Sequence, residues 1–387
     1  MAHGPEPGVV GLVRSTGGRL DTVRLTEGLA LRQGDGWRYV CPVQFGDALS
    51  PDALAAEDGD VYVVGSDGLL SMDGEGSVRA LDHPGLSRDT VLDLTSSHGS
   101  VYGLRYSDDR SELVRLDASD ATVLWSHDGF IQSLNADGER LWLTSTVDGT
   151  ATLHAVTSEG ESLQQRTVAV DRAGVITRVV QVLDALYAIE AQPSGNRLLR
   201  LPDVGDVPEV VYDAGSVVYG PIAEGAAGWF VADGMLMSLD NRTPGEQPVD
   251  AEAAPTALWS LLDETYLVSY LQVFRFDRDG VLQPEADLRQ LQPPDLTRVE
   301  DALQSECSNQ WTTASRDIAA RWGGGEQVPT AGSGGATAPE PQDTEPTGAH
   351  GGCTAVTAPL PARVPQKVVA LAALAGLVRR RNRQRPR

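Results

Sequence analysis

Up to about residue 296 the chain consists of short segments in which hydrophobic and polar positions alternate, separated by polar turns. Alternation with a period of two is typical of half-buried β-strands, and the longer period of amphipathic helices is missing from this part of the chain. Glycine (41 residues) and proline (23 residues) recur every few positions, as expected where many strands are joined by tight turns. The pattern therefore predicts an all-β fold.

The alternating pattern also repeats. Each copy has a short strand with an aromatic or apolar residue second in its core, then a polar turn, then a second alternating strand. Aligning that second position in six copies gives steps of 40, 40, 45, 43 and 37 residues between Tyr62, Tyr102, Trp142, Tyr187, Phe230 and Leu267. Repeats of this length match four-stranded β-propeller blades, which cannot bury their faces alone and cover one another around an axis. The recurring aromatic residues are therefore expected to pack between blades.

An earlier, degenerate copy begins at Leu20, so the repeats predict a single β-propeller of seven blades of four antiparallel strands, with six and eight blades left open. Closing such a ring brings together blades that are far apart in the sequence. The segment from Arg298 follows the last repeat. Its pattern is compatible with a closing strand or with a short helix packed on the ring.

Composition divides the rest of the chain. We predict a propeller over residues 1–322, a disordered Gly/Pro/Thr-rich linker over 323–352, and a C-terminal signal over 353–387. The formal net charge is −23, although eight basic residues and no acidic ones follow Cys353. Such an acidic surface repels phosphate backbones, which argues against nucleic acid as a partner.

Three cysteines are present. Cys41 and Cys307 lie near opposite ends of the predicted propeller, and Cys353 lies in the tail. This arrangement favours a Cys41–Cys307 disulfide across the contact that closes the ring, with two buried free thiols as the alternative.

The tail contains an apolar run from Val368 to Val378 that precedes an arginine cluster. A helix of this length would span about 17 Å, short of the roughly 30 Å of a bilayer core, but the run suits a short C-terminal helix that engages the membrane transiently. The layout resembles the MYXO-CTERM sorting signal of myxobacteria, and the resemblance rests on Gly352, Cys353, Arg379, Arg380 and Arg381. It implies export, processing near the cysteine by a sorting protease at the membrane, and attachment at the cell surface or outer membrane. The residues before Cys353 would then lie in an oxidising compartment, which favours the disulfide.

Two features of the sequence depart from that resemblance. Fourteen residues, including prolines, separate Cys353 from the apolar run, which leaves the cleavage point open. Export also requires a signal peptide, and the opening residues MAHGPEP contain no basic and apolar regions of that kind. We therefore expect that a signal peptide is missing from the sequence as given.

Two blade families are also similar to parts of the chain. The stretch from Val114 resembles the repeat phrase of quinoprotein-like propellers at Asp117, Ala118 and Trp125, which implies a tryptophan docked between blades but no bound quinone. Gly36 and Trp37 resemble an eroded Asp-box of sialidase-like propellers. Sialidase-like catalysis would need an arginine triad and a tyrosine nucleophile, which the sequence does not locate.

Ligand-binding and catalytic motifs are otherwise missing. The six histidines are scattered singly and are interpreted as surface or turn residues, at His3, His83, His98, His127, His154 and His350. Acidic turns at Glu57, Ser107 and Asp277 lack the EF-hand spacing of a calcium loop. We therefore predict no cofactor, no metal and no catalytic residue.

These observations favour a propeller anchored at the cell surface that serves as a binding or scaffolding module for a protein or glycan at one rim, with membrane contact only through the tail. The alternative is a secreted hydrolase or lyase that uses the central funnel, so the question of enzymatic activity stays open. A cofactor-free scaffold for outer-membrane assembly is a third reading.

Overall fold

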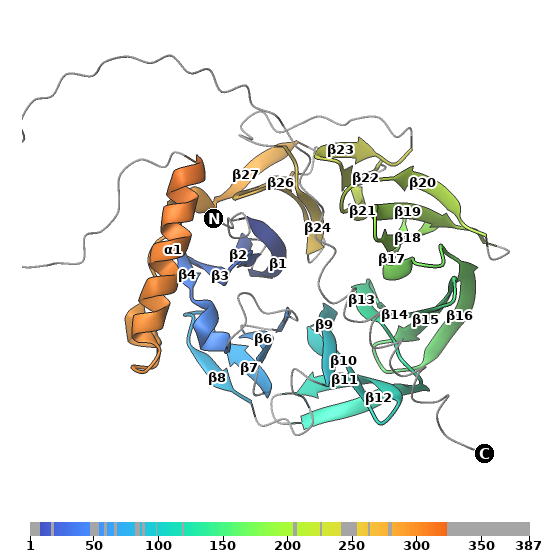
Figure 1. The fold of residues 1–387 in the computed structure, drawn as a ribbon, viewed down its shortest axis with the longest axis horizontal. Coiled ribbons are helices and arrows are strands. Elements are labelled where there is room, and N and C mark those ends of the chain that lie inside the picture. Colours follow the sequence, from blue (N-terminus) through green and yellow to red (C-terminus); the bar gives the residue numbers. More distant parts are fainter. Residues whose placement is uncertain are drawn as a thin grey trace, which may run out of the picture.

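The alternating segments pair into antiparallel sheets that are arranged as blades around a common axis (Figure 1). The structure is a computed structural model, which describes residues 8–16, 19–46, 54–57, 60–65, 68–81, 86, 90–97, 99–117, 120–203, 207–224, 227–240, 254–261, 264–277 and 281–322. There are seven blades, so the prediction of an all-β, seven-bladed propeller is confirmed.

The first four blades each contain four strands that follow one another in the sequence. Blade 1 comprises β1 (Val9–Thr16), β2 (Arg19–Leu25), β3 (Leu29–Gln33) and β4 (Gly36–Val40). Blade 2 comprises β5 (Leu54–Glu57), β6 (Asp60–Gly65), β7 (Gly68–Met72) and β8 (Val78–Ala80). Blade 3 comprises β9 (Val91–Ser97), β10 (Ser100–Ser107), β11 (Arg110–Asp117) and β12 (Asp120–Asp128). Blade 4 comprises β13 (Ser133–Asp137), β14 (Arg140–Val147), β15 (Thr150–Thr157) and β16 (Ser162–Ala169).

The remaining three blades continue the same meander. Blade 5 comprises β17 (Val175–Val182), β18 (Ala185–Gln192), β19 (Gly195–Leu201) and β20 (Glu209–Asp213). Blade 6 has three strands within the described residues, β21 (Tyr219–Glu224), β22 (Ala227–Ala232) and β23 (Met235–Ser238). Blade 7 comprises β24 (Ala257–Leu261), β25 (Glu264–Ser269), β26 (Gln272–Phe276) and β27 (Leu282–Asp287).

Apolar side chains are buried between blades, in one cluster for each of the seven contacts. The cluster between blades 3 and 4, for example, combines Tyr102 and Leu104 with Leu141 and Leu143. Successive residues of a strand point to opposite faces, so each middle strand contributes to the contacts on both of its sides. This is the mutual burial that the repeat predicted, since a single sheet exposes both of its apolar faces.

The six aligned residues are all buried and all lie on the second strand of their blades. In blades 2 to 5 the aligned residue faces the following blade, whereas Phe230 packs against blade 5 and Leu267 packs against blade 6. Tyr266 is the residue of blade 7 that faces the following blade. The alignment by aromatic character was therefore shifted by one residue in these two blades, and a one-residue shift reverses the face of the sheet.

The ring closes where β1 contacts β24, and we call the contact between blade 1 and blade 7 the closing seam. Each blade uses consecutive strands, so in the described residues no strand of one end completes the blade of the other. The segment after β27 covers this seam instead. It contains the 3₁₀ turns η2 (Leu288–Gln290) and η3 (Leu296–Arg298) and the helix α1 (Gln304–Trp322), which lies along the outer side of blade 1 in Figure 1.

The segment from Arg298 thus forms a helix, the second of the two predicted alternatives. A short strand-like contact precedes it, because the Gln292 amide donates to the Trp37 carbonyl at 2.7 Å and the Tyr39 amide donates to the Gln292 carbonyl at 3.0 Å. A third 3₁₀ turn, η1 (Pro42–Phe45), follows β4 and contacts α1. The predicted linker, 323–352, and the predicted short apolar helix lie outside the described residues.

Candidate functional site at the closing seam

The predicted site residues divide into two groups. Cys41 and Cys307 are joined by a disulfide with a Cα–Cα distance of 5.4 Å, and both residues are fully buried in the closing seam. This bond ties the end of β4 to the second turn of α1. The predicted sorting residues, Gly352, Cys353, Arg379, Arg380 and Arg381, lie outside the described residues.

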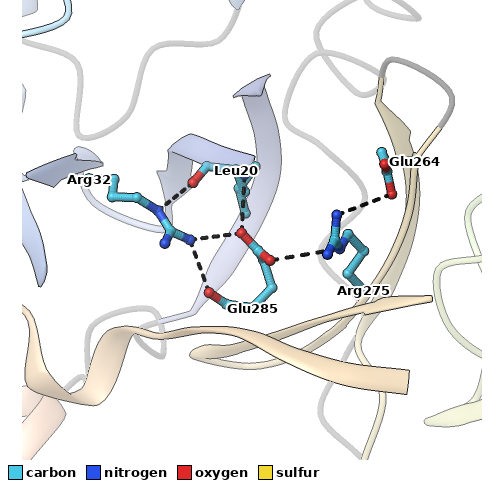
Figure 2. A network of polar contacts seen from close by, with 5 residues as sticks. All are labelled: Leu20, Arg32, Glu264, Arg275 and Glu285. Carbon is cyan, nitrogen blue, oxygen red and sulfur yellow. Dashed lines mark hydrogen bonds and ion pairs between the residues drawn. The ribbon is translucent and has the colours of Figure 1, made fainter. Parts of the chain in front are cut away.

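A buried ion pair also crosses this seam (Figure 2). The Arg32 guanidinium donates to the Glu285 carboxylate at 2.8 Å, to the Glu285 carbonyl at 3.0 Å and to the Leu20 carbonyl at 2.6 Å. Glu285 also accepts from the Leu20 amide at 3.2 Å, and Arg275 lies 3.8 Å from its second oxygen. Only 12% of the Arg32 side chain and 10% of the Glu285 side chain are exposed, so this pair, which we call the Arg32–Glu285 latch, is shielded from water.

Beside these contacts lies a small hollow, the seam cavity, of about 20 Å³. It is bounded by the turn between β2 and β3, the start of β1, the turn before β26 and the last part of α1. Its lining combines apolar side chains with two carboxylates and a phenol, from Gly8, Leu25, Thr26, Glu27, Tyr39, Leu271, Leu291, Ala314, Asp317 and Ile318. This volume suffices for one water molecule or for one ammonium group.

The polar groups of the seam cavity are poorly paired. The Tyr39 hydroxyl is buried and has no hydrogen-bond partner among the described residues, and only 1% of the residue is exposed. No hydrogen bond or ion pair is formed by the half-buried Glu27 carboxylate within the described part of the chain. Asp317 pairs at 3.5 Å with Arg316, whose side chain is largely exposed. Such a pair on the surface contributes little.

Burial, and second the nearby Asp317 carboxylate, raise the pKa of Glu27 above its ordinary value. Burial, and second the Glu27 carboxylate, raise the pKa of Tyr39, which therefore stays neutral. Both shifts have the same physical basis, since desolvation and like charges each disfavour an anion. The cavity thus brings two carboxylates together, and among the described residues only the largely exposed Arg316 pairs with either of them.

Chemically, this arrangement offers hydrogen-bond acceptors to a cation and apolar contact to whatever carries it. Two carboxylates and a phenol oxygen can accept from an ammonium group, and Leu25, Leu271 and Ile318 can contact the methylenes behind it. No pattern in the sequence pointed to these residues. Glu27 and Asp317 are 290 positions apart and become neighbours only because α1 folds back over the seam.

The sequence also missed a contact between two histidines. The interpretation of the histidines as surface or turn residues was wrong for His154, which is buried on β15. His127 of β12 and His154 of β15 lie with ring centroids 5.0 Å apart, across the contact between blades 3 and 4. Trp125 stacks on His127 with centroids 5.8 Å apart and lies 5.2 Å from His154, so this tryptophan does sit between blades. Burial, and second the nearby His127, lower the pKa of His154.

Other parts of the described structure offer less. An open groove of about 290 Å³ between blades 5 and 6 is lined by Asp184, Arg200 and Glu209, among others. The acidic turn residues Asp109 and Asp277 are bonded locally, to the Tyr106 hydroxyl and to the Val281 amide. Within the described ranges no group of three or more His, Cys, Asp or Glu side chains could hold a metal ion. No helix among these residues combines the length and the apolar character needed to cross a bilayer.

Neither a family model nor a curated protein sequence matches the chain. Among solved structures, a streptogramin B lyase shares 15% identity at a TM-score of 0.46, with 70% of this chain and 92% of that chain covered. BamB from Moraxella catarrhalis shares 13% identity at a TM-score of 0.40, with 72% and 94% covered. PorZ, a surface component of the type-IX secretion system of Porphyromonas gingivalis, shares 11% identity at a TM-score of 0.45, with 73% and 38% covered. At these identities the likeness concerns the propeller fold alone.

Proposed function

We propose that this protein is a binding or scaffolding module, displayed at the cell surface by its C-terminal tail. It binds a protein partner, and a basic group of that partner enters the seam cavity. The observation that carries the proposal is the unpaired Glu27 carboxylate, which faces Asp317 and the unpartnered Tyr39 hydroxyl in one cavity. Ionisable groups perturbed by burial and a neighbouring charge cluster at functional sites.

The burial of these polar groups favours a cationic ligand. A half-buried carboxylate beside a second carboxylate destabilises the fold, and the Tyr39 hydroxyl without a partner adds a desolvation cost of about 1–3 kcal/mol. A bound ammonium group would remove both penalties at once. A lysine side chain, or the amino terminus of a polypeptide, has this head group on a stem that suits the apolar wall.

Size and charge favour a protein over a glycan or a small substrate. The cavity has room for one head group rather than for a whole sugar ring, and ligand pockets for small molecules are usually 300–1,000 Å³. The cavity therefore suits a single anchoring side chain within a larger contact surface. An acidic chain with a net charge of −23 would also attract a basic partner over a distance.

The surface location rests on the tail and on the disulfide. The resemblance of the last 37 or so residues to a sorting signal implies export, and a buried Cys41–Cys307 bond suits a protein that folds in an oxidising compartment. The location is tested by fractionating cells that express the full gene, with Cys353→Ser as the variant expected to lose surface attachment.

Binding is tested with the full chain and a defined probe, a pentapeptide Gly-Ser-Lys-Ser-Gly that is blocked at both ends, and with the same peptide carrying acetyllysine. Calorimetry is expected to detect the lysine peptide and not the acetylated one. The variant Glu27→Gln/Asp317→Asn is expected to weaken binding at least tenfold, since each charge-assisted hydrogen bond contributes roughly 1–2 kcal/mol at a half-exposed site. Asp184→Asn/Glu209→Gln, which removes the same charge from the open groove, is the matched control.

The same variants are then used to capture partners from envelope extract. The proposal is supported if the wild-type chain and the control Asp184→Asn/Glu209→Gln both capture the same protein. The variant Glu27→Gln/Asp317→Asn, which we call the seam variant, should fail to capture it, and the wild-type chain should fail to capture it from an extract whose lysines are acetylated. Capture of the partner by the seam variant would show that the binding site lies elsewhere on the ring. Capture of a glycan by both variants alike, or turnover of a polysaccharide or peptide library, would favour the other readings of the propeller.

A further inference from the structure

His127 and His154 come from strands of neighbouring blades and meet within the contact that those blades bury. His154 lies in the middle of β15, paired with Leu143 on one side and with Gln165 on the other. His127 lies near the end of β12, opposite Ser111 of β11. The rings are 5.0 Å apart between centroids and are inclined by 54°.

Neither imidazole forms a side-chain hydrogen bond or ion pair within the described residues. Only 7% of His154 is exposed, and its Nε2 atom is buried without a hydrogen-bond partner among the described residues. Within the same part of the chain, no hydrogen bond or ion pair involves the His127 side chain either. Buried polar atoms are nearly always paired, so an orphaned nitrogen beside a second imidazole calls for a ligand that both rings can share.

The separation of the rings fits a shared metal ion. Nitrogen-to-metal distances of about 2.0–2.1 Å place the centre of each imidazole roughly 3.2 Å from the ion. Two such rings with centroids 5.0 Å apart would subtend about 103° at the ion, which suits adjacent positions of a tetrahedral or tetragonal site. His127 is only half-buried, so water can reach the remaining positions. No third His, Cys, Asp or Glu of the described residues joins the pair.

The backbone around the pair is held in place. Just after His127, the Gly129 carbonyl accepts from the Ser111 hydroxyl at 2.8 Å, and the Gly129 amide donates to the Asp109 carbonyl at 2.8 Å. The Trp125 ring stacks parallel to the His127 ring, with an interplanar angle of 3°. A ligand pair that is fixed by strands and packing before the metal arrives loses little freedom on binding.

We propose that His127 and His154 form a two-imidazole site, completed by water, for a late first-row transition-metal ion, with Cu²⁺ bound most tightly. Imidazole nitrogen is a preferred ligand of these ions, and affinity at nitrogen and oxygen sites rises to a maximum at Cu²⁺. The bound ion joins blade 3 to blade 4 directly. The proposal is independent of the seam cavity and of the partner proposed there.

The site is tested on the full chain in a His3→Ala background, because a free amino terminus with histidine third also binds Cu²⁺. Titration with Cu²⁺ is followed by tryptophan fluorescence, since a paramagnetic ion beside Trp125 quenches that ring. We expect a dissociation constant on the order of 1–10 μM and weaker binding of Zn²⁺, as the order of metal affinities requires. His127→Gln and His154→Gln are each expected to weaken Cu²⁺ binding at least tenfold, while Trp125→Phe is expected to remove the quenching and keep the affinity.

Two further measurements complete the test, and the first of them needs no variant. The electron paramagnetic resonance spectrum of the Cu²⁺-loaded chain should show two imidazole nitrogens at one equivalent of metal. Saturating Cu²⁺ should raise the melting temperature of the wild-type chain and not that of either histidine variant. Full affinity in either single variant, a spectrum with fewer than two nitrogens, or no saturable binding below about 100 μM would overturn the proposal.

Discussion

Removal of the Arg32 charge tests whether the Arg32–Glu285 latch holds the closing seam. In the variant Arg32→Met the apolar stem remains, but among the described residues the buried Glu285 carboxylate keeps only the Leu20 amide at 3.2 Å and the Arg275 guanidinium at 3.8 Å. The Leu20 and Glu285 carbonyls lose the guanidinium as well. Breaking a buried pair from one side typically costs 3–5 kcal/mol, because the remaining charge stays buried.

A loss of about 3 kcal/mol corresponds to a fall in melting temperature of roughly 5 °C for a domain of this size. The assay is denaturant unfolding followed by circular dichroism, together with tryptophan emission, because the Arg32 guanidinium lies 4.9 Å from the centre of the Trp37 ring. Glu285→Gln and the double variant complete a mutant cycle. The double variant is expected to be more stable than the sum of the single losses predicts, by about 2 kcal/mol.

Arg79→Met is the matched control for this prediction. Arg79 pairs with Asp60 at 3.0 Å, close to the distance in the latch, but 70% of its side chain is exposed. A pair of this kind typically contributes 0–1 kcal/mol, so the same substitution should have little effect there. Equal losses in Arg32→Met and Arg79→Met would refute the reasoning, because they would show that burial of the pair at the closing seam has no consequence for stability.

Three further predictions concern other residues of the described structure. The double variant Cys41→Ser/Cys307→Ser should lose about 2–5 kcal/mol, since the bond closes a loop with a sequence separation of 266; free thiols at both cysteines in the untreated protein, found by mass spectrometry, would contradict the pairing. Glu27→Gln should raise the free energy of unfolding by up to about 1 kcal/mol at pH 7. The gain should vanish below about pH 4, because the raised pKa of Glu27 means that the wild-type protein loses stability only as this carboxyl ionises. Melting curves recorded at several pH values test this. Gly174→Ala should cost about 1–3 kcal/mol in denaturant unfolding, because the new methyl would lie 2.1 Å from a Glu190 carboxylate oxygen; an unchanged midpoint would contradict this.

The blades could be predicted from the sequence because their signal is local and repeated. Tyr62, Tyr102, Trp142 and Tyr187 recur at a spacing that matches a blade, and all four pack between blades as expected. In blade 7 the aromatic residue Tyr266 lies one position before the aligned residue Leu267. The alignment there was therefore wrong by one residue. Aromatic character marks a buried strand, whereas the hydrogen-bond register decides which face of the sheet each residue occupies.

The sites could not be predicted, because they depend on contacts between segments that are far apart in the chain. His127 and His154 carry no metal-ligand spacing in the sequence, and only the packing of β12 against blade 4 brings their rings together. A weak signal existed for this cluster. Trp125 belongs to a phrase that implied docking between blades, and a histidine two residues later on the same strand must share its face.

The closing seam explains why a candidate site should lie there rather than at another contact. Six contacts between blades join segments that follow one another along the chain, whereas blades 1 and 7 meet without a connecting loop. Their contact therefore needs additional bonds, and it has them in the described structure as the Cys41–Cys307 disulfide, the Arg32–Glu285 latch and the helix α1. The same bonds fix the turn that carries Glu27 against the helix that carries Asp317. Two carboxylates that repel each other stay together only if the surrounding structure is rigid, so the reinforcement that closes the ring also holds together the acidic cavity that we propose as a binding site.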